Sequence, residues 1–256
     1  MPIVEFPGER IWVRAADGPE PALVFVHGAG GSSLSWIIQY RQLKGRNRIV
    51  QLDLPRHGRS GGQGRGHLVE YAEVVLGLLD ALAIERAVLL GHSMGGGVII
   101  ELALRHPERV AGLVLTATGA KLGVSPLILQ QIDEAPETLP ALMGDWICAP
   151  GAPEEIVQRS VTMLSETAPE VLGGDFRACN ILDLRPRLAE IAAPCLVVCG
   201  VEDKLTPPRY SEYLAEQIAD AELLLIEKAG HMVMVEQPEA FRAGVLSFLA
   251  RIGSPA

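Results

Sequence analysis

A single serine stands at the centre of the sequence Gly-His-Ser-Met-Gly, residues 91–95, between two apolar runs. The run before the motif is typical of a buried strand, and the run after it is typical of a helix. A tight turn from strand to helix requires small residues close to its apex, and the glycines at both ends of the motif provide them. We therefore predict that the Ser93 hydroxyl is exposed at the N-terminus of a helix, where free N–H groups favour developing negative charge.

A serine hydroxyl is a poor nucleophile at neutral pH unless a base lies within hydrogen-bond reach and a third group orients that base. His231 is the predicted base, because it lies in a loop just after the strand-like run Leu223 to Ile226. Asp203 is the predicted orienting acid, because it follows another strand-like run in the same way, with Glu202 as a weaker alternative. Loops at the carboxyl ends of parallel strands gather at one edge of a sheet, so we expect the three catalytic side chains to meet there.

Attack of a serine on a carbonyl group creates an oxyanion, which preorganised N–H donors stabilise. The backbone N–H of Met94 is one predicted donor. The second is the N–H of Ala29, within the glycine-rich sequence His-Gly-Ala-Gly-Gly at residues 27–31, which we name the oxyanion loop. This loop lacks the lysine and the spacing of a phosphate-binding loop, so we do not expect it to bind a nucleotide.

Five other polar residues are expected to support these groups rather than to react. Asp53, Arg56 and His57 follow a predicted strand, in the sequence Asp-Leu-Pro-Arg-His-Gly-Arg-Ser. We expect all three to hold that loop through hydrogen bonds between side chain and backbone. His27 and His92 flank the predicted oxyanion loop and the serine turn, and we expect them to buttress the backbone there.

Apolar runs typical of buried strands alternate with helical patterns along most of the chain. Such alternation predicts an α/β fold, in which helices cover both faces of a mostly parallel sheet. Two earlier segments, residues 2–6 and 10–14, are expected to supply short antiparallel strands. The buried runs are residues 22–26, 48–52, 87–90, 110–115, 195–199 and 223–226, and the helical patterns are residues 35–43, 67–82, 94–106, 208–218 and 238–252.

The alternation stops after the sixth strand of this series. Between residues 121 and 187 the sequence shows no buried-strand run, and prolines divide its helical patterns. We predict that residues 121–187 form an inserted helical cap over the strand ends that carry Ser93. Residues 1–120 and 188–256 are predicted to form the α/β core, and core and cap together one structural unit.

The apolar side chains of this cap must be buried somewhere, either in the cap's own interior or along the substrate pocket. We predict that Leu127, Met143 and Trp146 line the pocket from the cap. Met232, directly after the predicted base, is expected to line it from the core.

Composition narrows the range of partners. The chain has 256 residues and a formal net charge of -9, with 22 Lys and Arg against 31 Asp and Glu. This excess of negative charge argues against binding to nucleic acid or to a membrane surface, so we expect a small-molecule substrate. The four cysteines form no C-x-x-C pair, and neither they nor the six histidines cluster at metal-ligand spacing, so no metal site is expected.

The beginning of the chain lacks a basic segment followed by a long apolar run, and charges interrupt every apolar stretch. We also expect the four cysteines to be free, buried thiols. These features together predict a cytoplasmic protein without membrane spans. The sequence does not determine the oligomeric state.

Taken together, the motifs resemble those of the α/β-hydrolase family. The order Ser93, Asp203, His231, the His-Gly at residues 27–28, the serine turn and the sequence Gly-His-Met-Val-Met-Val-Glu-Gln-Pro-Glu at residues 230–239 carry this resemblance. It implies an eight-stranded sheet, a covalent acyl-enzyme and no cofactor. The likeness is greatest to small cap-bearing esterases and to their haloperoxidase-like and carbon-carbon hydrolase relatives.

We predict a serine hydrolase that cleaves small to medium carboxylic esters. A lactonase, a carbon-carbon bond hydrolase or a perhydrolase would use the same three residues. Relatives that cleave carbon-carbon bonds often carry tryptophan where this chain has Met232, which disfavours that alternative. A small-molecule receptor on a hydrolase fold is the alternative from a different functional class.

Overall fold

The computed structural model describes residues 2–253, so residue 1 and residues 254–256 of the predicted core lie outside the described part. Within residues 2–253, eight strands form one sheet in the order β1-β2-β4-β3-β5-β6-β7-β8. β1 pairs antiparallel with β2 and β2 with β4, and the remaining neighbours are parallel. The predicted mostly parallel sheet with antiparallel leading strands is confirmed. The strands are β1 (Ile3–Phe6), β2 (Glu9–Ala16), β3 (Ala22–Val26), β4 (Ile49–Leu52), β5 (Ala87–His92), β6 (Val110–Thr116), β7 (Cys195–Gly200) and β8 (Ala221–Ile226).

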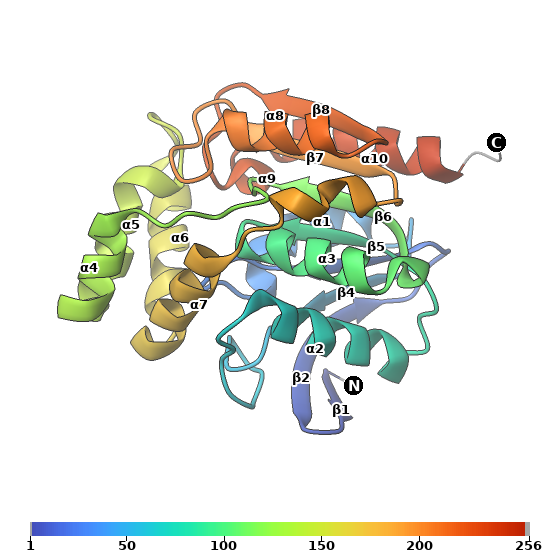
Figure 1. Ribbon diagram of the computed structural model, residues 1–256, viewed down its shortest axis with the longest axis horizontal. Helices are drawn as coiled ribbons and strands as arrows, with labels where there is room; N and C mark the ends of the chain where they lie inside the picture. The colour runs from blue at the N-terminus through green and yellow to red at the C-terminus, as the bar shows by residue number, and fades with distance from the viewer. Residues whose placement is uncertain (1, 254–256) are drawn as a thin grey trace.

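Helices cover both faces of the sheet (Figure 1), which explains why β3, β4, β5 and β7 are buried at every residue. Alternate residues of a strand face opposite sides, so Val24 and Leu23 belong to different hydrophobic clusters. The Val24 cluster includes residues of α2 (Leu68–Ala81), α3 (Met94–Arg105) and α8 (Pro208–Gln217). The Leu23 cluster includes residues of α1 (Ile37–Leu43) and α10 (Pro238–Gly253).

Four α-helices lie between β6 and β7, where the sequence predicts the cap. They are α4 (Pro126–Glu134), α5 (Leu139–Ile147), α6 (Glu154–Ser165) and α7 (Pro169–Ile181), and they group together at one end of the molecule, on the left of Figure 1. Prolines begin α4 and α7, where the missing N–H group costs no hydrogen bond. We call these four helices with their connections the inserted helices. That they form a cap distinct from the α/β core stays a prediction.

The sequence pattern does not predict several short helices, because one or two turns are too few to show a hydrophobic periodicity. The predicted helix at residues 35–43 begins with a 3₁₀ turn, Ser33–Trp36, and only then becomes α1. A further 3₁₀ helix spans Arg185–Glu190, and α9 spans Val233–Glu236. Within residues 2–253, no helix is long and apolar enough to span a membrane.

Candidate active site

Ser93 occupies the turn between β5 and α3. Its backbone has φ 52° and ψ −117°, a strained conformation for a residue with a side chain. Two hydrogen bonds hold this turn, from the Ser93 N–H to the Thr116 carbonyl at 2.9 Å and from Thr118 Oγ1 to the Ser93 carbonyl at 2.7 Å. A Cβ atom on Gly91 would lie 2.4 Å from the carbonyl oxygen of Gly95, so only glycine fits there. The backbone therefore fixes the serine before any substrate arrives.

Asp203 and His231 lie in the loops that follow β7 and β8. His231 Nδ1 donates to Asp203 Oδ2 at 2.9 Å, and the Thr206 hydroxyl donates to the same oxygen at 2.8 Å. Oδ1 accepts from the N–H groups of Leu205 and Thr206 at 2.8 and 2.9 Å. Burial alone would raise the pKa of Asp203, but the His231 ring and the Thr206 hydrogen bonds hold that pKa below its usual value. Asp203 is thus an ionised and fully bonded carboxylate that fixes the imidazole.

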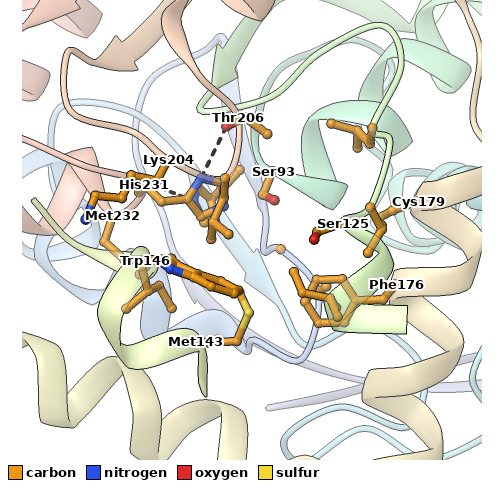
Figure 2. Close-up of a pocket in the computed structure, with 18 of the residues that line it drawn as sticks. Ser93, Ser125, Met143, Trp146, Phe176, Cys179, Lys204, Thr206, His231 and Met232 are labelled. Carbon is orange, nitrogen blue, oxygen red and sulfur yellow. Dashed lines mark hydrogen bonds between the residues drawn. The ribbon is translucent and has the colours of Figure 1, made fainter. Parts of the chain in front are cut away.

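Ser93 and His231 line one cavity of about 400 Å³, together with Ala29 of the oxyanion loop. Figure 2 shows both side chains among the residues that line it. Within residues 2–253, no acidic side chain lines this cavity, whereas the exposed Lys204 and Arg209 do. The cavity therefore places the predicted nucleophile and the predicted base within the same mostly apolar walls.

The oxyanion loop passes directly against the serine turn. A Cβ atom on Gly28 would lie 2.9 Å from His92 Nδ1 and 3.2 Å from Ser93 Cβ. His27 holds the loop, because its Nδ1 donates to the Gly28 carbonyl at 2.8 Å while its Nε2 accepts from the Leu54 N–H at 3.0 Å. Burial lowers the pKa of His27 to about 3, which agrees with this neutral ring. The other predicted oxyanion donor, Met94, is the first residue of α3.

Two further side chains fix the loop that carries His231. His92 Nε2 donates to the His231 carbonyl at 3.0 Å, and burial lowers the pKa of His92 to about 3. The Glu236 carboxylate accepts from the N–H groups of Gly230 at 3.0 Å, Met232 at 3.1 Å and Ala149 at 2.7 Å. Ala149 lies between α5 and α6, so Glu236 also ties the inserted helices to the histidine loop. The sequence analysis missed Glu236, although the motif at residues 230–239 contains it.

Three of the four predicted pocket residues, Met143, Trp146 and Met232, line the cavity, as Figure 2 shows. The prediction for Leu127 is wrong, because its side chain is 47% exposed and does not line the cavity. One residue further along α4, Ile128 does line it, since successive helical residues point about 100° apart. Sequence reasoning did not assign the other apolar lining residues from the inserted helices, which are Ile147, Met163, Leu164, Phe176 and Cys179.

Asp53 holds its loop as predicted, since its carboxylate accepts from the N–H groups of Ser33 at 2.6 Å and Arg59 at 3.0 Å. The prediction for His57 is only half right. Its Nδ1 contacts the Pro55 carbonyl at 3.0 Å, but its Nε2 bonds to Asp175 of α7 at 2.7 Å. This partner lies 118 positions away, so no local pattern could reveal it.

The sheet is mostly parallel, a serine occupies a strained turn after β5, and an aspartate-histidine pair follows β7 and β8. Together these features define a hydrolase of the α/β class. The family model described as "Alpha/beta hydrolase family" matches residues 23–243, and the chain belongs to this family.

Individual relatives cover nearly the whole chain. A pimeloyl-[acyl-carrier protein] methyl ester esterase of Pectobacterium carotovorum is 31% identical over 88% of this chain and 93% of its own length. The dihydrolipoyllysine-residue acetyltransferase component of an acetoin cleaving system of Pseudomonas putida is 34% identical over 94% of this chain. The match spans 66% of that relative, just under two thirds. Among solved structures, a thermophilic esterase superposes with a TM-score of 0.88 at 31% identity, covering 98% of this chain and 97% of that one.

Proposed function

We propose that this protein is a serine carboxylesterase. In the first step Ser93 Oγ attacks the ester carbonyl carbon while His231 Nε2 accepts the hydroxyl proton. Asp203 holds the imidazole through Nδ1 and stabilises its positive charge. The N–H groups of Ala29 and Met94 are the donors for the oxyanion that forms.

In the second step, His231 gives its proton to the oxygen of the leaving alcohol. The bond between the carbonyl carbon and that oxygen breaks, and the acyl group remains on Ser93 as an ester. A water molecule then attacks this ester while His231 accepts one of its protons. The return of that proton to Ser93 Oγ releases the carboxylic acid.

The observation that carries this proposal is that Ser93 and His231 line one cavity while the buried Asp203 orients the imidazole. The names of two similar proteins, a methyl ester esterase and a thermophilic esterase, support the choice of an ester over other acyl compounds. The cavity of about 400 Å³ has Met143 and Trp146 in its wall, which favours small to medium apolar esters.

The proposal is tested with p-nitrophenyl acetate, butyrate and octanoate, using the unaltered protein and Ser93→Ala. A fluorophosphonate label followed by peptide mass spectrometry locates the reactive serine. We expect turnover of the acetate and butyrate esters, loss of turnover in Ser93→Ala by about 10⁴-fold or more, and label on Ser93. Ser165→Ala, at an exposed serine of α6, is the matched control and should retain full activity.

A panel of lactones, meta-cleavage diketones and hydrogen peroxide with acetate separates the other acyl-transfer reactions. Faster turnover of any of these than of every acyclic ester would contradict the carboxylesterase assignment. No turnover and no label at Ser93 would contradict the serine mechanism itself.

A further inference from the structure

A second buried carboxylate lies against the oxyanion loop. Asp175 of α7 is fully buried. Its Oδ2 accepts from His57 Nε2 at 2.7 Å and from the Gly30 N–H at 2.9 Å, and its Oδ1 accepts from the Tyr71 hydroxyl at 2.9 Å. The proposed mechanism uses none of these bonds, although Gly30 directly follows the predicted oxyanion donor Ala29.

The partners of His57 make Asp175 a charged acceptor. His57 Nδ1 faces the Pro55 carbonyl at 3.0 Å and Nε2 faces the Asp175 carboxylate, so both ring nitrogens act as donors. Burial alone would lower the pKa of His57, but its attraction and hydrogen bond to Asp175 raise that pKa above 6.5. A charged carboxylate forms shorter and stronger hydrogen bonds than a neutral acceptor, so it holds the Gly30 N–H firmly.

The inserted helices hold Gly30 on both sides of its Cα atom. Asp175 accepts from its N–H, and Thr167 Oγ1 donates to its carbonyl at 2.8 Å. Gly30 has φ 61°, and a Cβ atom there would lie 2.4 Å from a methyl carbon of Leu172. Side chains from residues 167–175 thus contact the backbone of the oxyanion loop directly.

Other hydrogen bonds hold the peptide groups before Ala29, just as Asp175 and Thr167 hold Gly30 after it. The Gly28 carbonyl accepts from His27 Nδ1 at 2.8 Å and from the Gly31 N–H at 3.0 Å. In the part of the chain that the structure describes, the N–H of Ala29 donates to no protein acceptor. The loop therefore has its peptide groups fixed on both sides of one N–H group that remains available to a ligand.

We propose that Asp175 and Thr167 are positioning residues that hold the Ala29 N–H in the geometry needed to stabilise the oxyanion. The inserted helices then do more than cover the pocket, because they complete the oxyanion hole. This inference rests on the proposed function, in which Ala29 supplies one oxyanion donor. Its physical basis is that a donor stabilises a transition state best when its position is fixed in advance.

The first test compares kinetics of p-nitrophenyl butyrate hydrolysis for Asp175→Ala and Thr167→Val with the unaltered protein. We expect kcat to fall by about 10- to 100-fold in Asp175→Ala and about 3- to 10-fold in Thr167→Val, with KM changed less than about twofold. Thr167→Val leaves the buried His57–Asp175 pair intact, so this variant still tests the proposal if Asp175→Ala does not fold. Asp133→Asn changes an exposed carboxylate of α4, paired with Arg177, and is the control expected to retain full activity.

A second readout separates positioning from a general loss of structure. Butaneboronic acid forms a tetrahedral adduct with a reactive serine, whereas butyrate resembles only the product. We expect the inhibition constant of the boronic acid to rise in parallel with the fall in kcat, and that of butyrate to stay unchanged.

Hydrogen exchange followed by mass spectrometry tests the contact itself without relying on activity. Exchange in a peptide covering residues 27–34 should accelerate about tenfold or more in both variants, with core peptides unchanged. Unchanged exchange, or faster exchange with full kcat, would overturn the inference while Ser93→Ala still supports the esterase. Faster exchange in a protein that hydrolyses no ester would instead contradict the proposed function and, with it, the catalytic role of these residues.

Discussion

The core and the inserted helices build this site by different means. In the core, Ser93, Asp203 and His231 each follow a strand of the sheet, and side chains from loops at the same edge hold them, such as Thr206 beside Asp203 and Thr118 beside Ser93. In the inserted helices, the contacts to the site span long sequence distances, such as the 145 positions between Gly30 and Asp175. The core therefore positions the side chains that we propose to react, whereas the inserted helices contact the oxyanion loop and supply much of the cavity wall.

The largest expected effect tests the core directly. In Asp203→Asn the amide cannot stabilise the imidazolium and favours the wrong histidine tautomer, so kcat should fall by about 10³- to 10⁴-fold. Glu202→Gln, the neighbouring acid in the same loop, is the matched control. Steady-state kinetics on p-nitrophenyl butyrate measure both variants. Equal losses in the two variants would contradict the assignment of Asp203.

Glycine substitutions compare backbone tolerance in the two regions. Gly91→Ala places a Cβ atom 2.4 Å from a backbone oxygen, so we expect the free energy of unfolding to fall by about 2–5 kcal/mol. Gly174→Ala, within α7, meets nothing within 4 Å and should raise it by about 0.5–1 kcal/mol. Urea unfolding measures both values. Equal destabilisation at the two positions would contradict the view that the serine turn requires glycine whereas this position of α7 does not.

The His57–Asp175 pair, which joins the two regions, predicts a pH dependence of stability. Because the pKa of His57 is raised in the folded protein, the pair's contribution is fully present below the unfolded pKa of about 6.5 and disappears as the pH rises through the folded pKa. Each unit of difference contributes about 1.4 kcal/mol. Thermal unfolding between pH 6 and pH 10 should show this decline, and His57→Gln should flatten it. An unchanged decline in that variant would assign it to another group.

The smallest expected effect concerns substrate length. Met163 of α6 lines both the cavity and a neighbouring groove of about 190 Å³, and it accepts a hydrogen bond from Ser35 Oγ at 3.3 Å. Met163→Ala should join the two spaces and raise the octanoate-to-butyrate ratio of kcat/KM about 5- to 10-fold. Met143→Ala removes the same volume from the cavity wall without reaching the groove. A similar shift in both variants would show that volume alone sets the preference.

The strands, the serine turn and the loops that carry Asp203 and His231 could all be predicted from the amino-acid sequence. Buried strands leave continuous apolar runs, and the turn at Ser93 requires glycines at fixed positions, so both signals are local. Reactive residues just after strands also meet at one edge of a parallel sheet, which makes their proximity a consequence of topology.

The contacts between the inserted helices and the core could not be predicted from the sequence and became visible in the folded structure. The rotation of α4 placed Leu127 outside the cavity and Ile128 inside it, a choice that depends on packing against distant elements. The partnership of His57 with Asp175, and that of Glu236 with Ala149, join residues more than 80 positions apart. No strand register constrains such helices, so their orientation follows from the shape and the hydrogen-bonding groups of the surface on which they pack.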